Sequence, residues 1–189
     1  MGSPEPAAGV VAALTARGQS LATAESLTGG LLGAAITAVP GASAVYLGGV
    51  VAYATGMKRR LAGVDAAVLA AVGPIAEATA IALASGVKAV TGADWAVATT
   101  GVAGPEPQDG HEPGEVWVGL DGPSGPATAV RYDFVGDRRA VRESTVRAAL
   151  EVLGEAMAGV GTTSGNNENP RGVDAWSESY EDGQVESTS

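Results

Sequence analysis

The sequence predicts a single three-layer α/β/α domain built on a mixed, largely parallel sheet. Through the first half of the chain, apolar residues at helical spacing alternate with short apolar runs, an order typical of parallel strands joined by helices. Two later strands follow each other without a helix between them, which indicates a hairpin and therefore a mixed sheet. The 189 residues fit one domain, and the many Ala, Gly and Val residues predict a core of mostly small side chains.

The first elements are a helix, a strand and a second helix. Apolar residues recur at helical spacing over residues 7–17, and Gly18 ends this helix. Residues 20–24 predict a short strand that leads into a turn at Ser26. A helix is expected next over residues 28–38, ended by a Pro-Gly pair.

The middle of the chain predicts one strand and three helices. The near-continuous apolar run of residues 46–54 is typical of a strand buried on both faces. Residues 55–61 indicate the start of a helix, and residues 65–71 and 75–91 predict two more. The first of these helices carries three adjacent cations, Lys58, Arg59 and Arg60.

The last part of the domain predicts three strands and a closing helix. Residues 95–100 form the first strand, and residues 101–114, rich in Gly and Pro, are expected to form a loop. Residues 115–120 and 127–134 predict the hairpin strands, and residues 137–157 predict the final helix.

Composition excludes several kinds of site. Cysteine is absent and His111 is the only histidine, so thiol nucleophiles, disulfides and Cys/His zinc sites are excluded. The N-terminus lacks a basic segment followed by an apolar run, and no stretch reaches about 18 apolar residues. A cytoplasmic protein without membrane contact is therefore expected.

The net charge of −10 divides between two parts of the chain. Residues 159–189 hold six acidic residues and one arginine, and residues 1–158, which contain the domain at residues 7–158, carry the remaining charge of −5. Neither part has a basic stripe, so nucleic acid is not an expected partner. The polar composition of residues 159–189 predicts a disordered acidic tail, either purely solubilising or docking a partner around Trp176.

The segment Ala24-Glu25-Ser26-Leu27-Thr28-Gly29-Gly30 places two hydroxyls and two glycines where a strand becomes a helix. Ser26 is a candidate nucleophile there, and the free amides of the helix start favour a bound anion. The alternative is structural, with Ser26 as a turn residue and Thr28 as the helix cap.

Ser26, Lys58 and Thr100 each lie at or just after the end of a predicted strand, so they could converge at one edge of the sheet. A serine nucleophile needs a base, and Lys58 is better placed than His111, which lies in a polar loop without apolar neighbours. A partly desolvated lysine beside other cations acquires a lower pKa. The alternative is that the three cations form a solvated helix face.

Two further segments carry polar groups. The Gly-rich backbone of residues 101–104 could offer amides to an oxyanion or phosphate, with the Thr100 hydroxyl as an orienting group, or could be a simple strand end. Asp137 is expected to be the N-cap of the following helix. Arg138 and Arg142 share one face of the following helix, where they could bind a phosphate or face solvent.

The order of these segments resembles that of the CinA C-terminal domain family, which includes stand-alone nicotinamide-nucleotide amidases. The resemblance runs from about Val10 to Gly159. It is carried by five ordered motifs, Ala24-Glu25-Ser26-x-Thr28-Gly29-Gly30, Tyr53-x-x-x-x-Lys58, Thr100-Gly101-Val102-Ala103-Gly104-Pro105, Gly114-x-Val116-Trp117 and Gly136-Asp137-Arg138-x-x-Val141-Arg142.

The resemblance implies hydrolysis of nicotinamide mononucleotide to nicotinate mononucleotide and ammonia, without cofactor or metal, by a homo-oligomer. It implies that Ser26 is the nucleophile and Lys58 its base, with Tyr53, Thr100 and the backbone at Gly101 orienting the base and stabilising the oxyanion. The expected substrate-binding residues are Glu25, Thr28, Gly29, Gly30, Gly101, Ala103, Gly104, Arg138 and Arg142.

Three features depart from the family pattern: Leu27, Ala76 and the loop from Pro105 to Pro113. They leave the proposed catalytic groups in place and bear on substrate preference. The sequence does not contain the larger N-terminal domain of some members, so no pyrophosphatase-type activity is expected. Two alternatives stay open, a nucleotide-binding module acting through a partner in competence or DNA-damage physiology, and an amidase for another small carboxamide.

Overall fold

The structure, a computed structural model, describes residues 6–159. The predicted acidic tail and Trp176 lie outside the described residues, apart from Gly159, which ends the last helix. No helix within the described range is long and apolar enough to span a membrane.

Five strands form one mixed sheet with the order β2-β1-β3-β4-β5. The three strands β2, β1 and β3 run parallel, and β4 and β5 are antiparallel, as the hairpin in the sequence predicted. The strands are β1 (Leu21–Glu25), β2 (Tyr46–Val51), β3 (Trp95–Gly101), β4 (Glu115–Asp121) and β5 (Thr128–Asp133).

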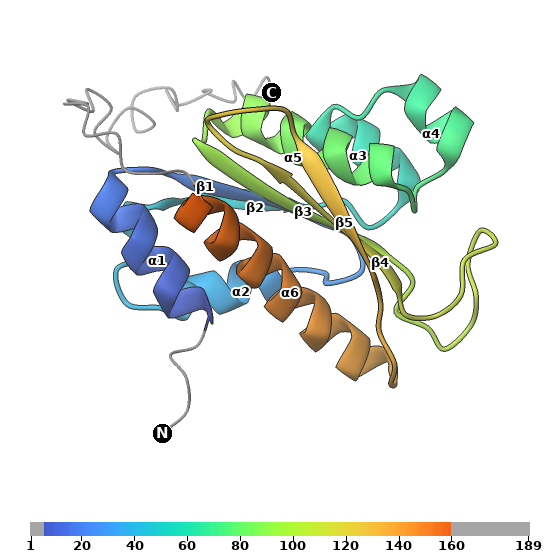
Figure 1. The fold of residues 1–189 in the computed structure, drawn as a ribbon. Coiled ribbons are helices and arrows are strands. Elements are labelled where there is room, and N and C mark those ends of the chain that lie inside the picture. Colours follow the sequence, from blue (N-terminus) through green and yellow to red (C-terminus); the bar gives the residue numbers. More distant parts are fainter. Residues whose placement is uncertain (1–5, 160–189) are drawn as a thin grey trace, which may run out of the picture.

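Helices cover both faces of the sheet (Figure 1), which confirms the expected layered α/β architecture. On one face lie α1 (Pro6–Arg17), α2 (Leu31–Thr37) and α6 (Arg138–Gly159), and on the other lie α3 (Thr55–Ala62), α4 (Ala66–Val72) and α5 (Glu77–Thr91). A single 3-10 turn, Ala42–Ala44, precedes β2.

The two faces of the sheet have different cores. Along β3, Val97 packs with the large side chains beneath α1 and α6, whereas Ala96 and Ala98 face the alanine-rich side beneath α5. Glycine lets α5 approach the sheet closely, since a Cβ at Gly119 would lie 2.2 Å from the carbonyl oxygen of Ala80. Small side chains therefore dominate the core on the α5 side only.

The prediction for residues 46–54 was wrong in one respect. Strand β2 lies at the edge of the sheet and alternates between half-buried and exposed residues, so it is not buried on both faces. Leu47 and Val51 each keep 47% of their surface exposed. A run of apolar residues indicates a strand, but its position within the sheet depends on the order in which the strands pair.

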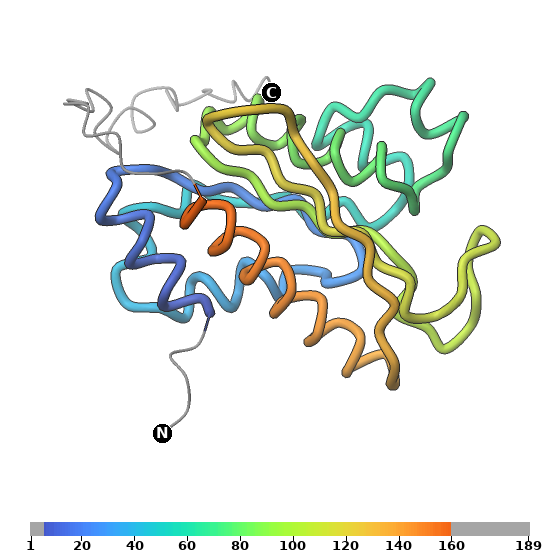
Figure 2. The backbone as a smooth tube through the Cα atoms, in the orientation of Figure 1, coloured from blue at the N-terminus to red at the C-terminus, as the bar shows by residue number. Residues whose placement is uncertain are grey.

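Two loops also differ from the prediction. Helix α2 begins at Leu31 rather than at residue 28, because Gly29 and Gly30 have φ values of 59° and 98° that interrupt a helix. The loop between β3 and β4, which projects beyond the sheet in Figure 2, contains a small hairpin. Its bridge joins Gln108 to His111 across Asp109 and Gly110, both with positive φ.

Candidate active site

A cavity of about 90 Å³ opens at the carboxyl ends of β1 and β3. Ligands of open α/β sheets commonly bind at this edge. The cavity is lined by several residues that the sequence singled out, namely Ser26, Tyr53, Lys58, Thr100, Gly101, Ala103, Gly104 and Arg138. The expected substrate-binding residues Glu25, Thr28, Gly29, Gly30 and Arg142 are not among its lining residues.

Ser26 and Lys58 are in direct contact in this cavity. The Nζ atom of Lys58 donates to Ser26 Oγ over 2.7 Å and to the carbonyl oxygen of Ala52 over 3.1 Å. Lys58 is 1% exposed, and within the described chain no carboxylate forms an ion pair with it. Burial lowers the pKa of Lys58 to about 8, so a useful fraction of the amine is neutral near physiological pH.

The position of Lys58 on α3 explains this burial. Lys58 and Ala62 lie four residues apart on the same face of the helix, and both point into the protein. Arg59 and Arg60 are exposed. The solvated-face alternative therefore holds for the two arginines and is wrong for Lys58, whose pKa falls because of burial.

The turn after β1 holds Ser26 at the floor of the cavity. Ser26 N donates to the carbonyl oxygen of Thr99 over 2.9 Å, and Gly29 N donates back to the carbonyl oxygen of Ser26 over 3.0 Å. The hydroxyls of Thr28 and Thr99 are 2.8 Å apart. Parallel pairing of β1 with β3 therefore fixes the position of Ser26 at the carboxyl end of β1.

Glu25 occupies the helix start that the sequence suggested for a substrate anion. Its carboxylate, in a side chain only 2% exposed, accepts from the amides of Gly30, Leu32 and Gly33 over 2.9, 3.1 and 2.8 Å. A buried carboxylate at a helix N-terminus satisfies amides that otherwise have no partner. These amides are therefore already engaged inside the protein and are not free to bind the phosphate of a substrate.

Replacing this carboxylate tests its structural role. Glu25→Gln is expected to lower the free energy of unfolding by about 1–3 kcal/mol. Both carboxylate oxygens accept hydrogen bonds from backbone N–H groups, and the glutamine NH₂ that replaces one of them is a donor that cannot accept these bonds. Urea denaturation measures the change, with Glu143→Gln on the exposed face of α6 as control. Equal stability of the two variants would contradict the assignment.

Tyr53 and Thr100 are engaged with other partners than Lys58. Arg138 donates from Nη2 to the Tyr53 hydroxyl over 2.6 Å and from Nη1 to the carbonyl oxygen of Gly104 over 2.9 Å. The Thr100 hydroxyl donates to the carbonyl oxygen of Pro74 over 2.7 Å. In this structure the Ala52 carbonyl, rather than Tyr53 or Thr100, orients the Lys58 amine.

The two arginines on one face of the last helix, each a candidate for binding a phosphate, have different positions. Arg138 lines the cavity. Arg142 instead donates from Nε to the carbonyl oxygen of Leu27 over 3.0 Å and from Nη2 to that of Thr28 over 2.7 Å. Only Arg138 is therefore placed to meet a ligand in this cavity.

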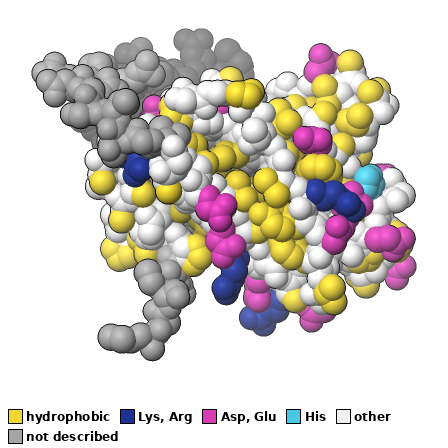
Figure 3. Space-filling view, in the orientation of Figure 1, with side chains coloured by type: hydrophobic (Ala, Val, Ile, Leu, Met, Phe, Trp, Pro, Cys, Tyr) yellow, Lys and Arg dark blue, Asp and Glu magenta, His cyan; other side chains and the backbone are white. Residues whose placement is uncertain are grey.

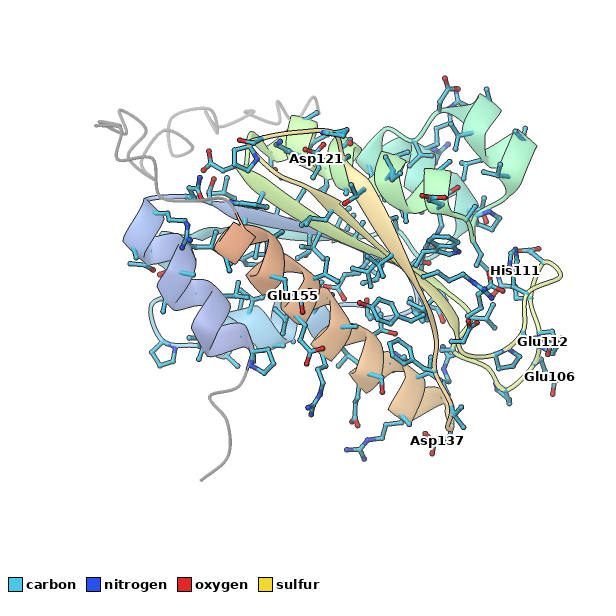
Figure 4. The ribbon with its side chains drawn as sticks, in the orientation of Figure 1. Glu106, His111, Glu112, Asp121, Asp137 and Glu155 are labelled. Carbon is cyan, nitrogen blue, oxygen red and sulfur yellow. The ribbon has the colours of Figure 1, made fainter. Side chains whose placement is uncertain are left out.

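Sequence reasoning missed five residues that line the cavity: Thr55, Pro74, Ile75, Glu106 and Gln108. For the last two the signal was the Asp109-Gly110 pair, which is typical of a tight hairpin turn. Glu106, His111 and Glu112 all lie on this β3–β4 loop (Figure 4).

His111 and the surface cations lie outside the cavity or are scattered. The Nδ1 atom of His111 lies 3.0 Å from a carboxylate oxygen of Glu115, so its ring is held in the loop and does not line the cavity. Within residues 6–159 no three His, Asp or Glu side chains gather as metal ligands. The face in Figure 3 shows scattered cations and no continuous basic stripe.

Fold and site together define an α/β protein with a buried serine–lysine pair in a cavity at the carboxyl ends of parallel strands. Comparison with known proteins identifies the family. The family model for the CinA C-terminal domain matches residues 5–157. The chain therefore belongs to the CinA C-terminal domain family.

Curated relatives and solved structures agree with this family. A CinA-like protein of Frankia casuarinae is 46% identical over 152 residues, which cover 80% of this chain and 35% of the relative. A CinA-like protein of an Anaeromyxobacter species is 48% identical over 149 residues, covering 78% and 36%. The chain thus spans about a third of the length of these relatives.

The fold is that of a solved family member. The structure of competence damage-inducible protein A from Klebsiella pneumoniae is similar, with a TM-score of 0.80 and 40% sequence identity. The match covers 83% of this chain and 98% of the Klebsiella chain.

Proposed function

We propose that this chain is an amidohydrolase that converts nicotinamide mononucleotide to nicotinate mononucleotide and ammonia. The observation that carries the proposal is the 2.7 Å contact between Ser26 Oγ and a buried lysine whose pKa is lowered to about 8. A neutral amine in that position is a general base for a serine nucleophile. The identity of the substrate rests on the family resemblance.

The proposed reaction proceeds through an acyl-enzyme. Neutral Lys58 takes the proton of Ser26 Oγ as the oxygen attacks the carboxamide carbon, and the resulting ammonium returns that proton to the departing ammonia. Water then attacks the ester, assisted by the same amine. The products are the carboxylate and regenerated Ser26.

Backbone amides beside the cavity support the developing oxyanion. Ala103 and Gly104 line the cavity, and their amides donate to no backbone carbonyl of the described chain. Free amides next to a reacting carbonyl stabilise negative charge on its oxygen. We assign these two residues to the oxyanion in place of the Thr100 hydroxyl, which already donates to the carbonyl oxygen of Pro74.

Arg138 is the proposed phosphate ligand. It lines the cavity, and its contacts with Tyr53 and Gly104 leave part of its five N–H donors unused. The Tyr53 hydroxyl holds this guanidinium at the opening of the cavity. Tyr53 therefore acts on the arginine in this proposal rather than on Lys58.

The experiment that tests the function measures ammonia and nicotinate mononucleotide released from nicotinamide mononucleotide by the purified chain. Nicotinamide riboside and nicotinamide serve as competing substrates that lack the phosphate or the whole ribosyl phosphate. Turnover that favours the mononucleotide supports the proposal. Turnover of another carboxamide alone would change the substrate, and binding without turnover would favour a nucleotide-binding module.

The pKa of Lys58 predicts how activity depends on pH. Only the neutral amine accepts the Ser26 proton, so kcat/KM is expected to rise with pH and level off above a pKa of about 8. At pH 7 roughly a tenth of the amine is neutral. Initial rates from pH 6 to 9.5 check this, and a profile that is flat or falls over that range would contradict Lys58 as the base.

A further inference from the structure

The turn that carries Ser26 is clamped from outside by Arg142. Ser26 and Gly29 close the turn through a backbone hydrogen bond, so Leu27 and Thr28 are its central residues. Arg142 binds both central carbonyl oxygens, one through Nε and the other through Nη2. One guanidinium therefore binds two successive peptide groups, Leu27–Thr28 and Thr28–Gly29, within the turn that begins at Ser26.

Helix α6 gives Arg142 a rigid base. Its neighbours Val141 and Thr145 are completely buried, which anchors this part of the helix against the sheet. Gly29 favours this turn through its φ of 59°, and a Cβ there would only reach ordinary contact distance, 3.4 Å, from Nη2 of Arg142. The contact joins two residues that lie 115 positions apart in the sequence, so no residue next to the turn provides the same contact.

Two carbonyls that accept from one planar group lose two hydrogen bonds together when that group is removed. A lysine carries its three donors on one nitrogen and cannot reproduce the planar, two-nitrogen fork of an arginine. The turn would then be free to shift, and displacements near 1 Å are sufficient to lower the rate of a reaction by about 100-fold.

We infer that Arg142 is a positioning residue that holds Ser26 Oγ within reach of Lys58, rather than a phosphate ligand. The inference rests on the proposed role of Ser26 as nucleophile. It does not depend on which carboxamide is the substrate.

The first test uses the reactivity of Ser26 towards a small alkyl fluorophosphonate. In this reaction a bond forms between Ser26 Oγ and phosphorus, the P–F bond breaks to release fluoride, and Lys58 takes the serine proton. Labelling of Arg142→Lys and Arg142→Ala is expected to be roughly 10- to 100-fold slower than that of the unmodified chain. Arg139→Lys is the control, because Arg139 lies on the same helix, has an 84% exposed side chain and, among residues 6–159, forms an ion pair with Glu143 alone.

The second test compares kcat and KM for nicotinamide mononucleotide and nicotinamide riboside. A positioning role lowers kcat for both by a similar factor and leaves both KM values nearly unchanged, whereas a phosphate ligand raises KM for the mononucleotide alone. Thermal unfolding verifies that Arg142→Lys is folded, and this conservative variant carries the test if Arg142→Ala does not fold.

Unaltered labelling of a folded Arg142→Lys variant, or a Ser26 that no fluorophosphonate labels in the unmodified chain, would overturn the inference. An Arg142 variant in which only the KM for the mononucleotide rises, with kcat unchanged, would overturn the inference in favour of phosphate binding. If the unmodified chain is labelled but does not hydrolyse the mononucleotide, the proposed substrate fails, and the labelling rates of the variants still decide the role of Arg142.

Discussion

Ser26→Ala is expected to lower the rate of nicotinamide mononucleotide deamidation by on the order of 10⁴-fold or more, since no acyl-enzyme can form without the hydroxyl. The backbone hydrogen bonds of Ser26 to Thr99 and Gly29 remain in this variant, and only the hydrogen bond between its side chain and Lys58 Nζ is lost, so the protein is expected to stay folded with a loss of about 1–3 kcal/mol in stability. Loss of activity would then reflect lost chemistry in a folded protein.

The measurement compares ammonia release by Ser26→Ala and by Ser43→Ala at equal protein concentration. Ser43 is exposed in the 3-10 turn before β2 and does not line the cavity, so its variant should match the unmodified chain. Thermal unfolding of both variants verifies the fold. Comparable turnover by Ser26→Ala would remove Ser26 as the nucleophile.

Lys58→Met is expected to lower activity strongly and, at pH 7, to make the protein more stable. Loss of the base lowers the rate by about 10²–10⁴-fold. The pKa of Lys58 falls from 10.5 to about 8 on folding, so burying the ammonium costs about 3 kcal/mol below pH 8. Methionine has a similar length and no charge to desolvate, although the Ala52 carbonyl loses a donor.

The pH dependence of this stability difference has a definite sign. Between about pH 8 and 10.5 the unfolded chain binds the proton of Lys58 more tightly than the folded chain, so folding becomes more favourable as pH rises. The advantage of Lys58→Met is therefore complete below pH 8 and declines towards pH 10.5. At the high end the neutral lysine is no longer penalised.

Urea denaturation at pH 7 and pH 10 measures this difference. Arg59→Met is the matched control, because the neighbouring Arg59 is exposed and its removal relieves no buried charge. Two results together would contradict a buried charge at this position: a Lys58→Met variant less stable than the unmodified chain at pH 7, and a stability difference between the two proteins that is the same at pH 7 and pH 10. Combined loss of activity and gain of stability would show that the site keeps a destabilising group for its chemistry.

Several parts of the site could be predicted from local patterns. Ser26 and Lys58 follow strands whose apolar character is evident, and parallel strands end at one edge of a sheet. Their meeting within 2.7 Å agrees with that geometry. The hairpin at Asp109 and Gly110 also had a local signal, because both residues tolerate the positive φ that the turn requires.

Other parts depended on contacts between distant segments. The run Lys58-Arg59-Arg60 reads locally as one charged face, yet packing of α3 buries the first residue and exposes the other two. Arg138 and Arg142 lie one helical turn apart, yet one faces the cavity and the other binds the Ser26 turn. Helical spacing alone could not separate these roles.

By itself the sequence determined the order of helices and strands, the mixed sheet and the edge where Ser26 and Lys58 meet, since these depend on apolar periodicity and turn residues within short segments. Only the tertiary structure decided that β2 is an edge strand, that Glu25 fills the helix start and that Arg142 clamps the turn. The reason is physical: burial and hydrogen-bond partners are set by which surfaces pack together, and those surfaces come from residues far apart in the chain.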